Sequence, residues 1–158
     1  MREIQDENRL RYLYTRHNYL LRVTENAIAR LIVDSAYRVH STLGPGLLES
    51  IYQAVLALEL GERGLHHVCQ QPVPVVYGPL QLKLGFRADI VVEDKVVIEI
   101  KSVETVMPVH KKQLLTYLRL TGMKLGYLLN FGESLMKEGI TRIINGDLQT
   151  LFRNSVAP

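Results

Sequence analysis

Asp89, Glu99 and Lys101 are charged residues in a stretch of sequence that is otherwise rich in valine and isoleucine. Side chains alternate between the two faces of a strand, so Glu99 and Lys101 are expected on one face. Carboxylates are ligands for Mg²⁺, which polarises a phosphoryl oxygen and lowers the pKa of a bound water. A neighbouring ammonium group can orient that water or neutralise developing charge. These residue types therefore suit metal-dependent phosphodiester hydrolysis, with Mg²⁺, or Mn²⁺ in its place, as the cofactor.

The register of the predicted hairpin decides whether Asp89 joins the other two charges. A two-residue turn at positions 94–95 pairs Asp89 with Ile100, which places its side chain on the wrong face. A three-residue loop at positions 93–95 pairs Asp89 with Glu99, and a shift of one residue exchanges the faces. We predict that the three charged side chains converge on one face at the mouth of a cleft, which requires the longer loop.

The same three charges could instead be solvated on an open sheet face or form a cross-strand ion pair. The neighbouring residues argue for the chemical interpretation, because they are apolar on both faces, as in a covered sheet. Charges in such a place need partners or a metal. The apolar neighbours are Phe86, Ile90, Val91, Val92, Val96, Val97, Ile98 and Ile100.

Two helices are predicted before this stretch. Apolar residues recur at steps of three and four from Thr24, which predicts an amphipathic helix with Thr24 or Asn26 near its start and its end at Leu43. The Gly-Pro-Gly sequence at positions 44–46 cannot continue a helix, because proline disfavours helical geometry at the preceding residue. A second helix is predicted over residues 47–63.

Later elements alternate between strands and helices. Runs rich in β-branched residues predict strands, and Pro108 opens a further helix. The predicted elements are strands at 68–77, 80–92, 95–100 and 124–130, and helices at 108–122 and 134–144. The order α-α-β-β-β-α-β-α predicts an α/β fold with a mixed β-sheet flanked by helices. We expect residues 1–23 to be a peripheral segment, either a helix or a mobile tail, 24–150 to be a single domain, and 151–158 to be a C-terminal tail.

Composition excludes several classes of protein. Of 158 residues, 47% are hydrophobic, and Cys69 is the single cysteine, so neither an intrachain disulfide nor a zinc ribbon can form. The net charge of +3 is compatible with a polyanionic partner but is weak for a dedicated nucleic-acid-binding domain. No signal peptide and no membrane-length apolar run is present. We therefore expect a cytoplasmic protein without a membrane partner.

The string GPGLLESIY contains the spacing Gly46-x-x-Glu49-x-x-Tyr52 and resembles the signature of the GxxExxY proteins, which belong to the PD-(D/E)XK nuclease superfamily. The resemblance extends from about residue 28 to 146 and includes Asp89 and Glu99-x-Lys101. It also covers Gln113-x-x-x-Tyr117, which is similar to a helix bordering the site of recombination-type exonucleases, and the Asn130-Phe131-Gly132 strand end. The family's Pro-Asp pair is Ala88-Asp89 here.

The resemblance implies a restriction-endonuclease-like fold and assigns a role to each residue of the site. Asp89 and Glu99 would bind the metal and Lys101 would assist catalysis, while Glu49 would add a ligand. Position alone favours helix capping as the role of Glu49, because the helix dipole stabilises any acidic residue in a first turn. Tyr52 is a supporting residue that is more often a core aromatic with a satisfied hydroxyl than a catalytic group.

Three further residues share one face of the predicted helix that begins at Pro108. Gln113 and Tyr117 are four positions apart, and His110 lies one turn before Gln113, so the three could line a cleft together. Alternatively they form a polar helix edge beside the core. A lone histidine in a first helical turn is more often structural or solvated than bound to phosphate.

The function expected from these residues is a Mg²⁺-dependent nuclease acting on DNA or RNA, with DNA favoured. A catalytically idle nuclease fold that binds nucleic acid or a protein is the alternative, although it would predict loss of one of the three central charged residues. Chemistry on another phosphate ester is a third interpretation. The sequence leaves a homodimer open.

Overall fold

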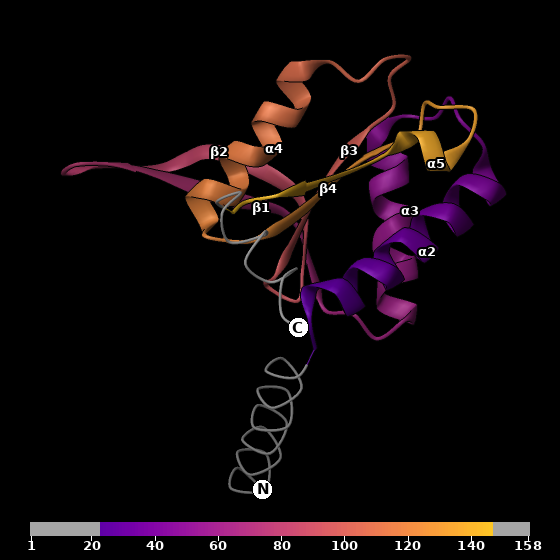
Figure 1. Cartoon of the computed structure of the whole chain (residues 1–158), viewed down its shortest axis with the longest axis horizontal. Helices are drawn as coiled ribbons and strands as arrows, with labels where there is room; N and C mark the ends of the chain where they lie inside the picture. Colours follow the sequence, from indigo (N-terminus) through magenta and orange to yellow (C-terminus); the bar gives the residue numbers. More distant parts are fainter. Residues whose placement is uncertain (1–22, 147–158) are drawn as a thin grey trace, which may run out of the picture.

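The computed structural model describes residues 23–146. The predicted N-terminal segment, apart from Val23, and the C-terminal tail lie outside these residues. The described chain forms an α/β fold in which helices cover both faces of a five-stranded sheet (Figure 1). The elements in chain order are α2 (Glu25–Leu43), α3 (Glu49–Glu62), β1 (His67–Tyr77), β2 (Leu80–Val92), β3 (Val96–Lys101), α4 (Pro108–Thr121), β4 (Leu125–Asn130), α5 (Met136–Gly139) and β5 (Ile140–Ile144).

The strands follow one another across the sheet in the order β1-β2-β3-β4-β5. All neighbours are antiparallel except β3 and β4, which are parallel. The connection between these two strands contains α4, as a parallel pair requires a crossover. The sheet is therefore mixed, as the sequence predicted.

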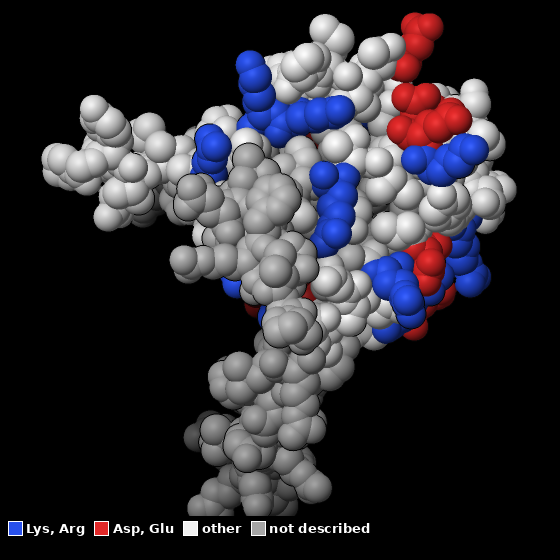
Figure 2. Space-filling view, viewed as in Figure 1, with Lys and Arg blue, Asp and Glu red and all other residues white. Residues whose placement is uncertain are grey.

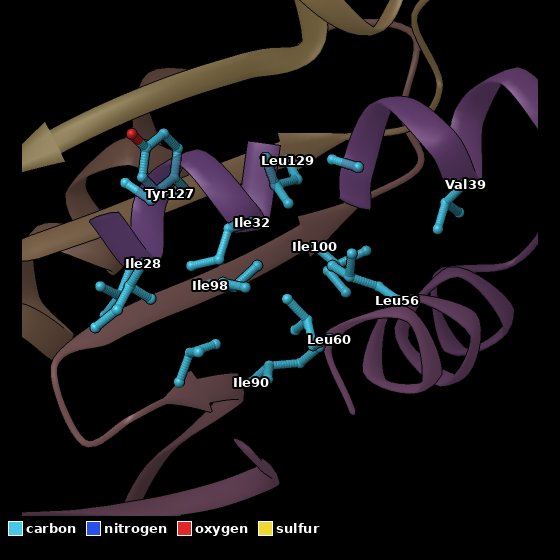
Figure 3. Packing of buried hydrophobic residues seen from close by; sticks show 14 of the residues in the cluster. Ile28, Ile32, Val39, Leu56, Leu60, Ile90, Ile98, Ile100, Tyr127 and Leu129 are labelled. Carbon is cyan, nitrogen blue, oxygen red and sulfur yellow. The ribbon is translucent and has the colours of Figure 1, made fainter. Parts of the chain in front are cut away.

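Two apolar clusters hold the helices to the sheet. Alternation sends Ile90, Ile98 and Ile100 toward α2 and α3, and in Figure 3 Ile98 lies beside Ile32 of α2 and Ile100 beside Leu56 of α3. The other sheet face packs against α4 through a second cluster of Val73, Ala88, Val91, Val97, Leu114, Tyr117, Leu118 and Leu128. The strands are apolar on both faces because both faces are covered.

Of the two residues predicted near the start of the first helix, Thr24 is the one that caps it. The hydroxyl of Thr24 accepts the backbone N–H of Ala27 at 3.2 Å, which caps α2. The predicted loop between β2 and β3 is also confirmed, because Val92 pairs with Val96 and leaves residues 93–95 between them. The ladder ends at Ile90 and Ile98, and the same register continued by one residue would set Asp89 opposite Glu99.

The predicted last helix, 134–144, is wrong over its second half. Helix α5 is a single turn, and residues Ile140–Ile144 form β5 instead. This segment contains three isoleucines and a threonine, which favour a strand. It pairs antiparallel with β4 from Leu125 to Leu129, so β4 is not an edge strand and its backbone groups are satisfied on both sides.

Candidate active site

Asp89, Glu99 and Lys101 converge where β2 separates from β3. The ladder between these strands ends at the pair Ile90 and Ile98. Beyond it, Oδ2 of Asp89 accepts the backbone N–H of Ile100 at 2.8 Å. On the other strand, Lys101 Nζ lies 2.8 Å from Oε1 of Glu99. The predicted triad of charges is thus brought together.

Glu99 is almost fully buried, with 3% of its surface exposed. Its Oε1 atom accepts hydrogen bonds from Lys101 Nζ and, at 3.2 Å, from Gln113 Nε2. Its Oε2 atom is buried without a hydrogen-bond partner. An unpartnered carboxylate oxygen is costly in such a place. Glu99 therefore has an oxygen available for a further ligand.

The electrostatic balance of the site is negative. Burial, followed by the charge of Asp89, raises the pKa of Glu99 to about 7. Burial also raises the pKa of Asp89 above its ordinary value. Burial lowers the pKa of Lys101, but its hydrogen bond with Glu99 and the surrounding carboxylates outweigh that effect and raise it. The single ammonium group does not offset both carboxylates, and a cation would favour their charged forms.

Helix α4 contributes Gln113 and Tyr117 to the site. Gln113 donates from its amide nitrogen to Glu99 and to the hydroxyl of Tyr117. Tyr117 is buried and packs against Phe86 of β2, with ring centroids 5.3 Å apart. Burial raises the pKa of its phenol. The predicted pair therefore reaches the carboxylates through Gln113.

His110 has a different place. Its Nδ1 atom accepts the backbone N–H of Met107 at 3.2 Å, where α4 begins. Its described hydrogen bond thus closes the start of the helix and reaches none of the charged site residues. This contact fits a structural role for His110 at the start of the helix.

Glu49 lies in the first turn of α3 and reaches the end of β3. Its Oε1 atom accepts the backbone N–H of Ser102 at 3.1 Å, and Oγ of Ser102 donates to the carbonyl of Leu47 at 2.7 Å. The charge of Glu49 is close enough to raise the pKa values of Asp89 and Glu99. Glu49 is exposed, yet it borders the site.

Tyr52 is a core residue that fixes the turn before α3. It has no exposed surface, and its ring stacks on Phe131 with centroids 4.5 Å apart. Its hydroxyl donates to the carbonyl of Gly44 at 2.6 Å and accepts the N–H of Leu47 at 3.2 Å. Gly46 has a φ of 103°, which favours glycine. The predicted motif therefore holds Glu49 in place through this turn.

Two residues near the site were not among the predicted ones. Gln70 donates to Asp89 Oδ1 at 3.1 Å and to Gln53 Oε1 at 2.6 Å. Its φ of 54° is unusual for a residue within a strand. In the sequence, only the glutamine pair at positions 70–71, within an otherwise mostly apolar strand, could have indicated that Gln70 lies at the site.

Asn130 is the second of these residues, and the sequence marked it only as part of a motif. It is fully buried, and its side chain accepts the N–H of Val103 at 3.0 Å and donates to the carbonyl of the same residue at 2.8 Å. A Cβ at Gly132 would lie 2.3 Å from that carbonyl oxygen, so only glycine fits there. These contacts hold the segment that follows Lys101 against the end of β4.

The donor set fits a divalent cation that prefers oxygen ligands. Asp89 and Glu99 supply carboxylates, and Oε2 of Glu99 has no partner. Within residues 23–146, no group of three or more His, Cys, Asp or Glu side chains is placed to hold a metal ion together. Two protein carboxylates are sufficient for Mg²⁺, which keeps several of its waters.

An acidic pair beside a lysine, at the end of a mixed sheet covered by helices, defines a class of nuclease-like α/β proteins. A family model described as the PD-(D/E)XK nuclease superfamily matches residues 26–143. The chain belongs to this superfamily, as the sequence predicted. Its function is therefore nuclease-like.

Comparison with solved structures gives a distant match, and comparison with curated sequences gives none. The chain is similar to the crystal structure of an alkaline exonuclease, LHK-Exo, from Laribacter hongkongensis, with 17% identity and a TM-score of 0.39, over 84% of this chain and 88% of that one. No curated protein sequence matches the chain. Among the described helices, none has the length and apolar character needed to cross a membrane.

Proposed function

We propose that the protein is a nuclease that uses Mg²⁺, or Mn²⁺ in its place, to hydrolyse phosphodiester bonds of DNA. The observation that carries the proposal is the buried Oε2 atom of Glu99, which has no partner and lies in a group whose negative charge exceeds its positive charge. A bound divalent cation would satisfy that oxygen. It would supply a polarised phosphoryl oxygen and a more acidic water.

The residues of the chain have separate tasks in this proposal. Asp89 and Glu99 hold the cation, and Asp89 is kept in place by the N–H of Ile100. Lys101 orients the attacking water or neutralises charge on the phosphate. Glu49 is an outer carboxylate partner of the same ion. Gln113 and Tyr117 position the Glu99 carboxylate and are not assigned a role in the reaction itself.

The charge distribution around the site supports a polyanionic substrate. Helix α4, which borders the site, contains Lys111, Lys112 and Arg119, all exposed, and no acidic residue. Figure 2 shows basic side chains around α4, while most of the visible acidic ones lie on the opposite half of the same face, together with further basic ones. Lysine and arginine side chains neutralise the phosphates of a nucleic-acid backbone.

The experiment that tests the proposal compares metal binding and cleavage. Calorimetric titration of Mg²⁺ into the wild type should show binding that is lost in Asp89→Ala. Cleavage of a labelled DNA duplex should be lost with it. Asp34→Ala is the matched control, because Asp34 is an exposed residue of α2 on the other side of the sheet. Metal binding that survives in Asp89→Ala would refute the proposed site, and binding without cleavage would favour an idle nuclease fold.

A further inference from the structure

The β1–β2 hairpin extends well beyond the helices that cover the rest of the sheet (Figure 1). The register of its two strands shifts between Val73 and Val75, and the hairpin continues from there to its turn at residues 78–79. We call residues 75–82 the arm. Two-stranded ribbons without a third strand or a helix on them are only marginally stable in water. An arm of this kind therefore gains stability from something that covers it.

One face of the arm is apolar. Val75 pairs with Leu82 and Tyr77 pairs with Leu80, so these four side chains share a face by alternation. Tyr77 is 81% exposed and Leu80 is 53% exposed. Val76, which pairs with Gln81, lies on the opposite face. An exposed apolar stripe of this kind marks an interaction surface.

The charges near the arm indicate which kind of partner covers it. From Val73 to Ala88 the sequence contains no acidic residue, and its charged residues are Lys83 and Arg87. The neighbouring α4 is likewise free of acidic residues. Residues 73–88 therefore combine apolar side chains with positive charge alone. This combination fits nucleic acid, which has apolar groups on its bases and negative phosphates on its backbone.

The position of the arm relates it to the candidate active site. Leu80 at its tip and Asp89 in the site lie on the same strand, β2. At about 3.3 Å per residue, the tip reaches up to roughly 30 Å from Asp89. That length corresponds to roughly nine base pairs of duplex. A duplex lying on the arm would therefore enter the site at its other end.

We propose that the arm lies in the major groove of B-form DNA, with Tyr77 and Leu80 against thymine methyl groups and the exposed Arg87, nearer the site, toward the phosphates. The major groove of B-DNA admits a two-stranded ribbon, whereas that of duplex RNA is too deep and narrow for side chains to read. The inference rests on the proposed nuclease function and names the substrate as duplex DNA.

The test measures binding without cleavage, by fluorescence anisotropy in EDTA. The probes are an A·T-rich duplex of about 20 base pairs, the same duplex with deoxyuridine in place of thymine, and the matching RNA duplex. Wild type should bind the thymine duplex most tightly, with a loss of roughly fourfold for each methyl group that the arm buries. The Tyr77→Ser/Leu80→Ser variant should bind the thymine and deoxyuridine duplexes equally.

Val76→Ser is the matched control, because it changes an exposed apolar residue on the other face of the same arm, and it should keep the preference for thymine. Equal binding of the thymine and deoxyuridine duplexes by wild type, or tighter binding of the RNA duplex, would overturn the proposal. A wild-type dimer that the double variant converts to a monomer would also overturn it, because a second copy would then cover the arm. Binding is measured without metal, so failure of this proposal leaves the proposed cleavage standing, and failure of cleavage leaves arm binding measurable.

Discussion

The carboxylate of Asp89 accepts the backbone N–H of Ile100 at 2.8 Å, at the point where the ladder between β2 and β3 has ended. The side chain thus replaces a bond that the strand backbone no longer makes. Because Ile100 follows Glu99 directly, this bond keeps the two carboxylates next to each other. Their mutual repulsion is built into the fold, and a cation is the partner that relieves it.

Glu99→Gln should abolish metal-dependent cleavage without unfolding the protein. Glutamine keeps the volume and can still accept the hydrogen bond from Lys101, but it removes the charged ligand. We expect cleavage to fall by at least ~100-fold, which is the upper range seen for the outer partners of metal sites. Cleavage rates and circular dichroism of the purified variant measure this.

Glu104→Gln, at an exposed position in the segment between β3 and α4, is the control for this change and should cleave like wild type. An undiminished cleavage rate in Glu99→Gln would refute its role as a ligand.

The metal-free protein should become less stable as pH rises through about 7. The pKa of Glu99 is about 7 in the folded protein, against an ordinary value of 4.5 in the unfolded chain. Between these values the folded state holds a proton that the unfolded state has lost. The stabilisation is therefore complete below about pH 4.5 and is lost as pH rises through about 7, with a size on the order of 2–3 kcal/mol.

Urea unfolding in EDTA at about pH 5 and about pH 8 measures this difference. Subtracting the same difference for Glu99→Gln removes the contribution of the other titrating groups. If wild type and variant change equally between the two pH values, Glu99 does not titrate as the structure indicates.

Glu49→Gln should weaken Mg²⁺ binding while leaving the melting temperature of the metal-free protein nearly unchanged. Glutamine retains an oxygen that can accept the N–H of Ser102, so the contact between α3 and the end of β3 is kept. Loss of the charge removes an attraction for the bound cation that the metal-free protein does not have, so its main effect is on metal affinity. Calorimetry and thermal melting separate the two effects.

Glu62→Gln is the matched control, since Glu62 is an exposed acidic residue at the other end of α3. Unchanged metal affinity in Glu49→Gln would leave Glu49 as a residue that only fastens the start of the helix.

Tyr52→Phe should destabilise the protein by about 1–3 kcal/mol, because the carbonyl of Gly44 and the N–H of Leu47 each lose a hydrogen bond with the hydroxyl. Denaturant unfolding of the metal-free protein measures the loss. Tyr37→Phe, at an exposed position of α2, should change stability by less than ~0.5 kcal/mol. Equal stability of the two variants would mean that the Tyr52 hydroxyl does not hold the turn.

Local patterns in the sequence predicted most of the fold. The helix at Thr24, the turn after Leu43 and the first strands follow from apolar spacing, proline and β-branched residues, and all of them are present. The strand β5 was missed because the spacing of apolar residues over so short a run does not separate a strand from a helix, although the β-branched composition of 140–144 favours a strand. Its pairing with β4, a contact between separate segments of the chain, made it a strand.

Within the site, the sequence by itself determined that Glu99 and Lys101 share a face, because alternation along a strand is a local property. Only the tertiary structure decided that Asp89 joins them. Residues 93–95 form the longer loop, with φ of 52° at Glu93, whose buried carboxylate accepts the N–H of His66 at 2.7 Å. That bond joins residues far apart in the chain and stabilises a conformation that local preferences disfavour. The partners of the site carboxylates, including Gln70, were fixed in the same way, since packing between distant segments has no trace in local spacing.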